Sequence, residues 1–289
     1  MNGMNSGMRS LTMSLIFVLG AMAADAPTLT FLFKTVNVPR ESSTQIMAVN
    51  NAGALAGTYT DSNSVIHGFM RKSGRVTTID HPGGLLTVCY DINSNLAIVG
   101  FYQNSNLAYE AFLYQDGAFT DIPGPSGSTA SRAYGINDLG SVVGDYVDAS
   151  GSKHGFLWDG TTYTTLDVPG AVASIAKGIN KSGAITLNWW NSSSLEQSSI
   201  YNNKRYTKIN VPGAIQTSAF HINSAGDVVY WWLDASGIYH GELRHLGKFY
   251  KVDYPNRTHT FADGINDHGV IVGSYQSGSS NPHGYEATY

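Results

Sequence analysis

Three ionisable side chains, Asp91, His221 and Asp263, interrupt short stretches of small and apolar residues. Carboxylate oxygens are preferred ligands of Ca²⁺, and a neutral imidazole accepts a proton near pH 7. We therefore predict that Asp91 and Asp263 bind a calcium ion and that His221 acts beside it as the general base of a hydrolase. His259 is an alternative base, and Glu41 is a further ligand or base.

Aromatic and cationic side chains occur in the same stretches and beside them. Tyr90 and Tyr134 offer aromatic faces, while Arg132, Lys177 and Arg257 carry positive charge. Rings of this kind pack against apolar ligand faces, and buried charges need a partner. We predict that these five residues bind the substrate. With Tyr134 as the base and a cation neutralising a uronate, the set is also compatible with a polysaccharide lyase.

These residues act together only if the fold brings them to one place, and an internal repeat indicates how. The dipeptide Ile-Asn or Val-Asn occurs six times, with Asn spacings of 43, 44, 43, 43 and 43 residues, at Asn50, Asn93, Asn137, Asn180, Asn223 and Asn266. Asp91 and His221 stand two residues before the asparagine, where three copies have glycine and one has alanine, and Asp263 stands three residues before it. A period of 40–45 residues is typical of a propeller blade.

The pattern within each unit predicts four short β-strands. In residues 173–212 we expect strands at 173–180, 184–190, 197–201 and 206–211, separated by turns and one polar loop. Four strands per unit fit a propeller blade, and a solenoid of regular β units is the alternative.

The two chain ends favour the closed ring. The sixth copy stops at Tyr289, after its third strand, and residues 28–39 match the fourth strand of the other copies. A ring explains this division, because pairing the two ends removes two exposed strand edges. We predict an all-β, six-bladed propeller of four antiparallel strands per blade, in which the N-terminal strand completes the last blade.

Residues that recur in every copy are best explained by what every blade needs. The asparagine begins a turn, since an Asx side chain bonds backbone groups two residues on, although six Asn carbonyls in a ring are also a candidate cation site. The histidines seventeen residues later, such as His67 and His154, would tie strands together rather than bind metal. The aromatic nine residues after each asparagine packs between blades or stacks on sugars, and Cys89 is a small packing residue.

Composition and the chain start restrict the location and the partners. The 289 residues carry a formal net charge of -4 with no dense Lys/Arg cluster, which argues against nucleic acid. Arg9, the apolar run 11–22 and the small residues around Ala23 predict a bacterial-type signal peptide over 1–26, followed by one domain over 27–289. We expect a secreted monomer, extracellular or periplasmic, without membrane attachment after cleavage.

The motifs Ile-Asn-x-x-Gly, His67-Gly68-Phe69, Glu110-Ala111-Phe112 and His154-Gly155-Phe156 resemble those of the predicted extracellular HAF-repeat proteins. The resemblance covers residues 28–289 and implies secretion and a repeat fold, but no common reaction. The predicted architecture is similar to six-bladed lactonases that hold one calcium ion in the central tunnel. On that analogy we place a calcium-dependent lactonase or esterase, acting on a small lactone or ester, slightly ahead of a non-catalytic carbohydrate- or protein-binding propeller.

Overall fold

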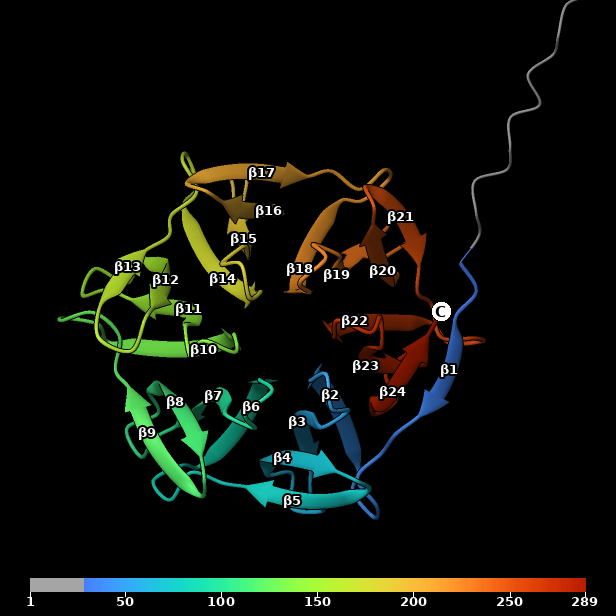
Figure 1. Cartoon of the computed structure of the whole chain (residues 1–289), viewed down its shortest axis with the longest axis horizontal. Coiled ribbons are helices and arrows are strands. Elements are labelled where there is room, and N and C mark those ends of the chain that lie inside the picture. The colour runs from blue at the N-terminus through green and yellow to red at the C-terminus, as the bar shows by residue number, and fades with distance from the viewer. Residues whose placement is uncertain (1–28) are drawn as a thin grey trace, which may run out of the picture.

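The computed structural model describes residues 29–289, in which 24 β-strands form six four-stranded antiparallel sheets and there is no helix. The sheets stand as blades around one central axis (Figure 1). This confirms the predicted six-bladed propeller. The predicted signal peptide, residues 1–26, lies outside the described residues. No helix in residues 29–289 is long and apolar enough to cross a membrane.

Blades 1 to 5 each run from an innermost to an outermost strand in chain order. Blade 1 contains β2 (Ser43–Val49), β3 (Leu55–Thr60), β4 (Ile66–Lys72) and β5 (Arg75–Ile79). Blade 2 contains β6 (Leu86–Ile92), β7 (Ile98–Gln103), β8 (Tyr109–Gln115) and β9 (Ala118–Ile122). Blade 3 contains β10 (Ala130–Ile136), β11 (Val142–Val147), β12 (Lys153–Trp158) and β13 (Tyr163–Thr165).

The second half of the ring repeats this order. Blade 4 contains β14 (Ala173–Ile179), β15 (Ile185–Trp190), β16 (Glu196–Asn202) and β17 (Arg205–Ile209). Blade 5 contains β18 (Gln216–Ile222), β19 (Val228–Leu233), β20 (Tyr239–His245) and β21 (Lys248–Lys251). Blade 6 contains β22 (His259–Ile265), β23 (Ile271–Gln276) and β24 (His283–Thr288), and its fourth strand is β1 (Leu32–Thr35) from the other end of the chain.

The ring closes as the chain ends predict. β1 pairs antiparallel with β24, with Leu32 opposite Thr288 and Thr35 opposite Tyr285. In Figure 1 the C-terminus lies directly beside β1. The solenoid alternative is excluded, because a solenoid would leave these two strands at opposite ends of the molecule.

The hydrophobic core lies between neighbouring blades, in six clusters around the ring. Close approach explains the glycine in the His-Gly-Phe motif: a Cβ on Gly68 would lie 2.7 Å from the Ile79 carbonyl oxygen and 2.5 Å from the Cys89 Sγ. Cys89 is fully buried in this contact, and burial raises the pKa of its thiol. It is therefore the packing residue that the sequence predicts.

The recurring histidine ties the third strand of a blade to the segment after the fourth. His67, His154 and His240 each place Nδ1 2.7–2.8 Å from an aspartate in that segment, namely Asp80, Asp167 and Asp253. Each ring also packs on the aromatic nine residues after the asparagine, as Tyr59 does on His67 at 5.0 Å between centroids. The structural role predicted for these histidines is confirmed.

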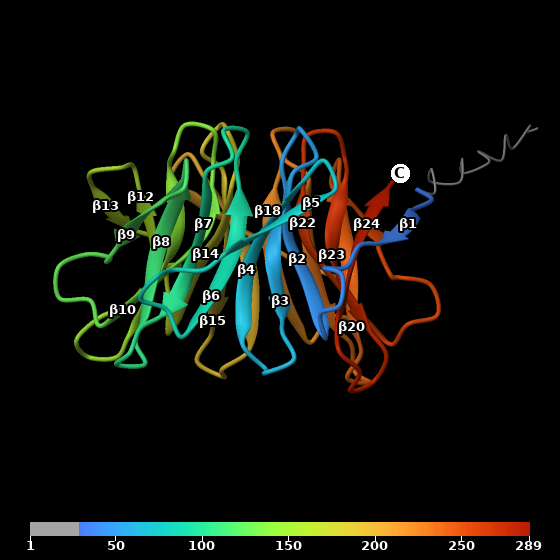
Figure 2. The same cartoon turned by 90° about the horizontal axis from the view of Figure 1, so that it is seen from below.

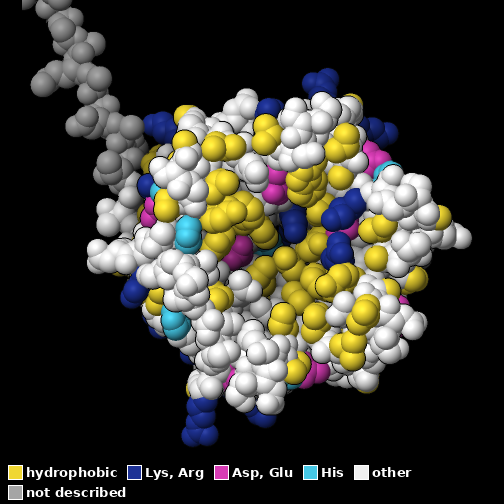
Figure 3. Space-filling model, turned by 180° about the vertical axis from the view of Figure 1, so that it is seen from behind, with side chains coloured by type: hydrophobic (Ala, Val, Ile, Leu, Met, Phe, Trp, Pro, Cys, Tyr) yellow, Lys and Arg dark blue, Asp and Glu magenta, His cyan; other side chains and the backbone are white. Residues whose placement is uncertain are grey.

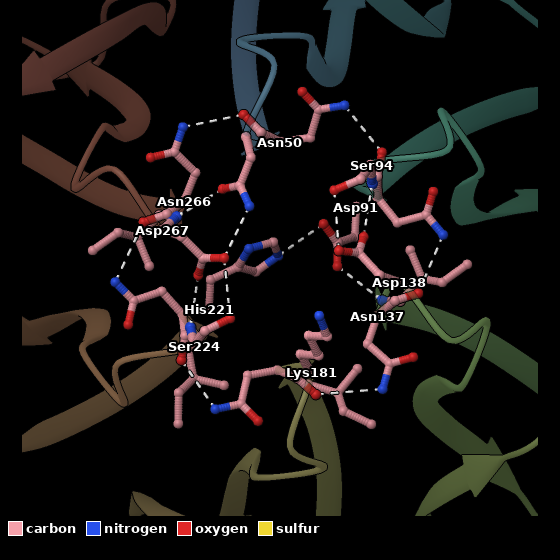
Figure 4. A pocket seen from close by; sticks show the side chains of 18 of the residues that line it. Asn50, Asp91, Ser94, Asn137, Asp138, Lys181, His221, Ser224, Asn266 and Asp267 are labelled. Atoms are coloured by element: carbon pink, nitrogen blue, oxygen red, sulfur yellow. Dashed lines mark hydrogen bonds and ion pairs between the residues drawn. The ribbon is translucent and has the colours of Figure 1, made fainter.

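The six asparagines form a continuous belt around one end of the axis, shown in Figure 4. Each Oδ1 accepts two backbone N–H groups of its own turn, as Asn50 does from Ala52 and Ala54. This confirms the predicted turn role. In addition, each Nδ2 donates to the backbone carbonyl of the asparagine in the next blade, at 3.0–3.3 Å, and the sixth bond returns from Asn266 to Asn50.

Candidate functional site

The inner strand of every blade contains a β-bulge just before its asparagine. In blade 2 the register shifts between Cys89 and Asp91, and blades 1, 3, 4 and 6 shift at the corresponding residues. In blade 5 the shift extends from Ala219 to Ile222. A bulge adds one unpaired residue and redirects side chains. The bulged residues are Met47, Tyr90, Tyr134, Lys177, Phe220 and Asp263. Several of them meet across the axis, as the contacts below show.

The opposite face from that in Figure 1 has a hollow at its centre, with hydrophobic and cationic side chains around it (Figure 3). We call this hollow the central mouth. In the side view of Figure 2 the loops between second and third strands lie at one end of the barrel-like ring, away from the asparagine turns. Three rows of residues differ between blades, and several of their members meet around the mouth. They are the bulged residues; the row Thr58, Phe101, Asp145, Asn188, Trp231 and Ser274; and the row Ile66, Tyr109, Lys153, Glu196, Tyr239 and Pro282.

Blades 2 and 3 build one aromatic wall of the mouth. Tyr90 packs on Tyr134 at 4.7 Å between ring centroids and on Phe101 at 5.8 Å. Phe101 in turn packs edge-on against Tyr109 at 5.3 Å. Tyr134 is 6% exposed and forms the deep end of this wall, whereas Phe101 and Tyr109 are half-buried.

Blades 5 and 6 build a second aromatic wall. Phe220 packs on Trp231 at 6.1 Å, and Trp231 packs edge-on against Tyr239 at 5.1 Å and Phe261 at 5.9 Å. Phe220 is 9% exposed, whereas Trp231, Tyr239 and Phe261 are half-buried. Because blades 2 and 5 are opposite members of a six-bladed ring, the two walls face each other across the axis.

The ammonium group of Lys177 lies between the two walls. Lys177 Nζ, from blade 4, is 3.6 Å from the Tyr134 ring centroid and 5.2 Å from those of Tyr90 and Phe220. Four blades therefore meet at this point, which places it on the axis. Burial lowers the pKa of Lys177 to about 8, against the attraction of Asp145.

Arg132 lies nearer the rim of the same side. Its guanidinium is 4.6 Å from the Tyr109 ring centroid, and its Nη1 donates to Asp145 at 3.2 Å. Asp145 is fully buried, and its second carboxylate oxygen has no hydrogen-bond partner among residues 29–289. The sequence prediction that Tyr90, Tyr134, Arg132 and Lys177 share one site agrees with these contacts.

Asp263, from blade 6, is one of the acidic groups of the mouth. It is 5% exposed, and burial raises its pKa to about 8, with Lys177 the one attraction that opposes the shift. The carboxyl is therefore mostly protonated at neutral pH and can donate a hydrogen bond to a ligand.

We expect Asp263→Asn to stabilise the fold increasingly as pH rises from 5 to 8. The native carboxyl keeps its proton over this range while the unfolded one has lost it, so wild-type stability falls by up to roughly 1.4 kcal/mol per pH unit. The asparagine variant does not share this loss. Urea unfolding at each pH measures the difference, with the exposed Asp116→Asn as the control for net charge. A difference that stays constant between pH 5 and 8 would contradict the raised pKa.

Asp91 and His221 meet at the other end of the axis, inside the asparagine belt. His221 Nε2 lies 3.4 Å from Asp91 Oδ1. Asp263 does not join them, because it occupies the bulge position one residue earlier in its strand and faces the mouth with Lys177. The predicted cluster of Asp91, His221 and Asp263 is therefore corrected to a pair and a separate carboxyl.

Of the remaining predicted site residues, His259 contacts the second wall, whereas Arg257 and Glu41 belong neither to the two walls nor to the Asp91–His221 pair. Arg257 packs over the Tyr275 ring at 5.4 Å, and Glu41 lies half-buried in the segment after β1. His259 begins β22, its Nδ1 accepts the backbone N–H of Tyr239 at 3.2 Å, and the two rings are 5.7 Å apart, so it adjoins the second wall.

No group of three or more His, Cys, Asp or Glu side chains within residues 29–289 is arranged to hold a metal ion. Asp91 and Asp263 in particular lie near opposite ends of the central axis. The calcium ion and the hydrolase that depends on it therefore stay predictions.

The sequence analysis did not predict that residues of second and third strands line the mouth. Phe101, Trp231, Tyr109 and Tyr239 belong to rows that vary between blades as strongly as the inner-strand row does. That variation between blades could have identified them, because residues that are not required for blade structure are free to form a binding site.

Comparisons with known proteins agree with the fold. No family model matches the chain, and no curated protein matches its sequence. Among solved structures, the lectin of Aleuria aurantia, described as a six-bladed β-propeller with a novel fucose recognition mode, has a TM-score of 0.53 at 12% identity over 85% of this chain and 93% of its own. AofleA from Arthrobotrys oligospora has a TM-score of 0.56 at 10% identity over 88% of this chain and 86% of its own. The SapL1 lectin, solved with α-methyl fucoside, has a TM-score of 0.56 at 12% identity over 86% of this chain and 94% of its own. At these identities the likeness shows the shared propeller fold.

Proposed function

We propose that this chain is a secreted, non-catalytic carbohydrate-binding propeller whose binding site is the central mouth. The observation that carries the proposal is the pair of aromatic walls that face each other from opposite blades. A sugar ring has apolar C–H faces and a polar edge, so it fits between aromatic side chains that are accompanied by a few hydrogen-bonding groups.

Polar groups lie beside the aromatic walls, where they can bond to the polar edge of a sugar. Asp263 is a donor when protonated, and Glu196 from blade 4 is half-buried, with its pKa raised by burial. Lys177 stands between the walls with its ammonium against three rings. The blades that lack a full aromatic set thus supply the hydrogen-bonding groups.

The comparisons support a carbohydrate ligand over a lactone. Two of the similar structures, the Aleuria aurantia lectin and SapL1, are described by their recognition of fucose or a fucoside. Fucose carries a methyl group in place of a hydroxymethyl group, so it presents more apolar surface to an aromatic wall than most hexoses do. Fucosides are therefore the first ligands to test.

We expect the protein to bind a subset of glycans on an array and to lose this binding in Trp231→Ala. Truncating a central aromatic typically costs about 2 kcal/mol, which is roughly a thirtyfold loss of affinity. Calorimetry with the best glycan measures the loss. Trp158→Ala is the matched control, because Trp158 packs on Tyr163 on the outer strands of blade 3, away from the mouth.

Two outcomes would overturn the proposal. One is glycan binding that survives both Trp231→Ala and Tyr239→Ala, since both residues form the second wall. The other is turnover of lactones or aryl esters in the absence of any glycan binding, which would restore the hydrolase prediction.

A further inference from the structure

A cavity of about 80 Å³ lies on the axis inside the asparagine belt, at the opposite end from the mouth (Figure 4). Asp91 and His221 project into it from β6 and β18, which belong to opposite blades. They are 5% and 9% exposed. No other blade has a polar residue at this strand position.

The other blades show what the position normally requires. Blades 3, 4 and 6 have glycine there, and a Cβ on Gly178 would lie 2.4 Å from the Phe220 carbonyl oxygen of the next blade. Blade packing thus favours the smallest residue. Two polar side chains at opposite blades depart from this local rule, and such departures are expected at functional sites. The small residues of the remaining blades leave the space that these two side chains face.

His221 leaves a buried polar atom unsatisfied. Its Nε2 is buried and has no hydrogen-bond partner among residues 29–289. The Asp91 carboxylate lies 3.4 Å away, but the two groups do not meet in hydrogen-bond geometry. Both Asp91 oxygens are instead held in place by backbone N–H groups, Oδ1 by Ile92 at 2.7 Å and Oδ2 by Ile136 at 2.8 Å. A buried nitrogen without a partner costs stability unless a bound species satisfies it.

We propose that Asp91 and His221 bind one divalent transition-metal cation of the zinc type. Two ligands about 2.0–2.1 Å from a tetrahedral zinc ion lie roughly 3.4 Å apart, which matches the separation of Nε2 and Oδ1. Carbonyl, carboxylate and water oxygens are the ligands that Ca²⁺ prefers, whereas imidazole nitrogen suits zinc, copper and nickel. Two protein ligands leave two positions for water, which enters from the open end of the cavity.

Calorimetric titration of the chelator-treated full chain with Zn²⁺ tests the site, with thermal unfolding as a second readout. We expect one Zn²⁺ per chain and a rise in melting temperature that EDTA reverses, since a ligand that binds only the native state stabilises it. Asp91→Asn and His221→Gln should each weaken binding at least tenfold. Titration with Co²⁺ adds a spectroscopic signature, because a tetrahedral nitrogen and oxygen site gives visible absorption.

His245→Gln is the matched control. His245 also faces an aspartate, but its Nδ1 makes a normal hydrogen bond of 2.9 Å to Asp227, so its removal should leave Zn²⁺ binding unchanged. Zn²⁺ binding that is equally tight in both site variants would overturn the proposal, as would Ca²⁺ binding with no response to Zn²⁺. If one variant fails to fold, the Co²⁺ spectrum and stoichiometry of the wild type still decide. Glycan binding is measured separately, so failure of one site leaves the other testable.

Discussion

Deletion of residues 29–38 is expected to abolish cooperative folding of the propeller. This segment contains β1, which supplies the outer strand of blade 6 and then crosses to blade 1. Val36 and Val38 are 4% and 7% exposed in the cluster that joins these two blades. Phe33 packs on Tyr254 and Tyr285 at 5.1 and 5.5 Å between centroids.

The size of the loss follows from burial. Each of the two buried valines contributes about 1.5–3 kcal/mol and the half-buried Phe33 roughly half as much, so the three amount to roughly 4–8 kcal/mol, comparable with the whole stability of a typical domain. The deletion also exposes the edge of β24, which invites aggregation. Circular dichroism, urea unfolding and size-exclusion chromatography measure the outcome against a chain that begins at residue 27.

A circular permutant separates loss of closure from loss of residues. Joining Tyr289 to Leu29 through a short Gly/Ser linker and opening the chain after Pro39 keeps every described residue and completes blade 6 within one segment. The Phe31 and Tyr289 rings are 5.5 Å apart, so a few linker residues span the gap. We expect the permutant to fold. A stable, monomeric deletion variant would show that β1 is dispensable for the ring.

The fold was predictable because the same residue types recur at the same positions in all six blades. Asn50 and its five equivalents set the period, and residues 28–39 identified the missing strand. The predicted strands of blade 4 differ from β14, β15, β16 and β17 by at most two residues at any end. Repetition therefore determined the architecture without any information about contacts between blades.

The site was predictable only in part, for two physical reasons. The bulge turns consecutive residues towards the axis at different depths, so Asp263 faces the mouth whereas Asp91 and His221 face the other end. A regular alternation of side chains along a strand does not predict this difference in depth. In addition, Phe101 and Trp231 reach the mouth from second strands, whereas Asp91, His221 and Asp263 lie on first strands.

The asparagine belt was missed for a related reason. The turn role of the side chain is local and can be inferred from the glycine that follows. The bond from Nδ2 joins residues 43 or more positions apart and depends on how neighbouring blades pack. The sequence therefore predicted the role of the side-chain oxygen in the turn, and the structure adds the role of the side-chain nitrogen between blades.

Asn180→Ala is expected to destabilise the propeller by about 3–5 kcal/mol. The buried Asn180 side chain donates to the Asn223 carbonyl at 3.0 Å and accepts the backbone N–H groups of Ser182 at 3.1 Å and Ala184 at 2.9 Å. Its loss leaves the buried Asn223 carbonyl and Ala184 N–H and the part-buried Ser182 N–H without this partner. Each buried group costs about 1–3 kcal/mol, less what solvent recovers at the turn. Urea unfolding at pH 7 measures the change.

Asn180→Asp isolates the bond between blades. An aspartate keeps both turn acceptors but places a carboxylate oxygen against the Asn223 carbonyl oxygen, so we expect a loss of about 2 kcal/mol at pH 7 that shrinks in acid as the new carboxyl is protonated. Asn191→Ala is the matched control, because Asn191 accepts the N–H groups of Ser193 and Leu195 in the same turn geometry but lies in an exposed loop with no bond to another blade. Its loss should be about 1 kcal/mol. Equal losses for Asn180→Ala and Asn191→Ala, or an Asn180→Asp variant as stable as the wild type, would show that the belt contributes only its turns and that the blades are held together by their apolar cores alone.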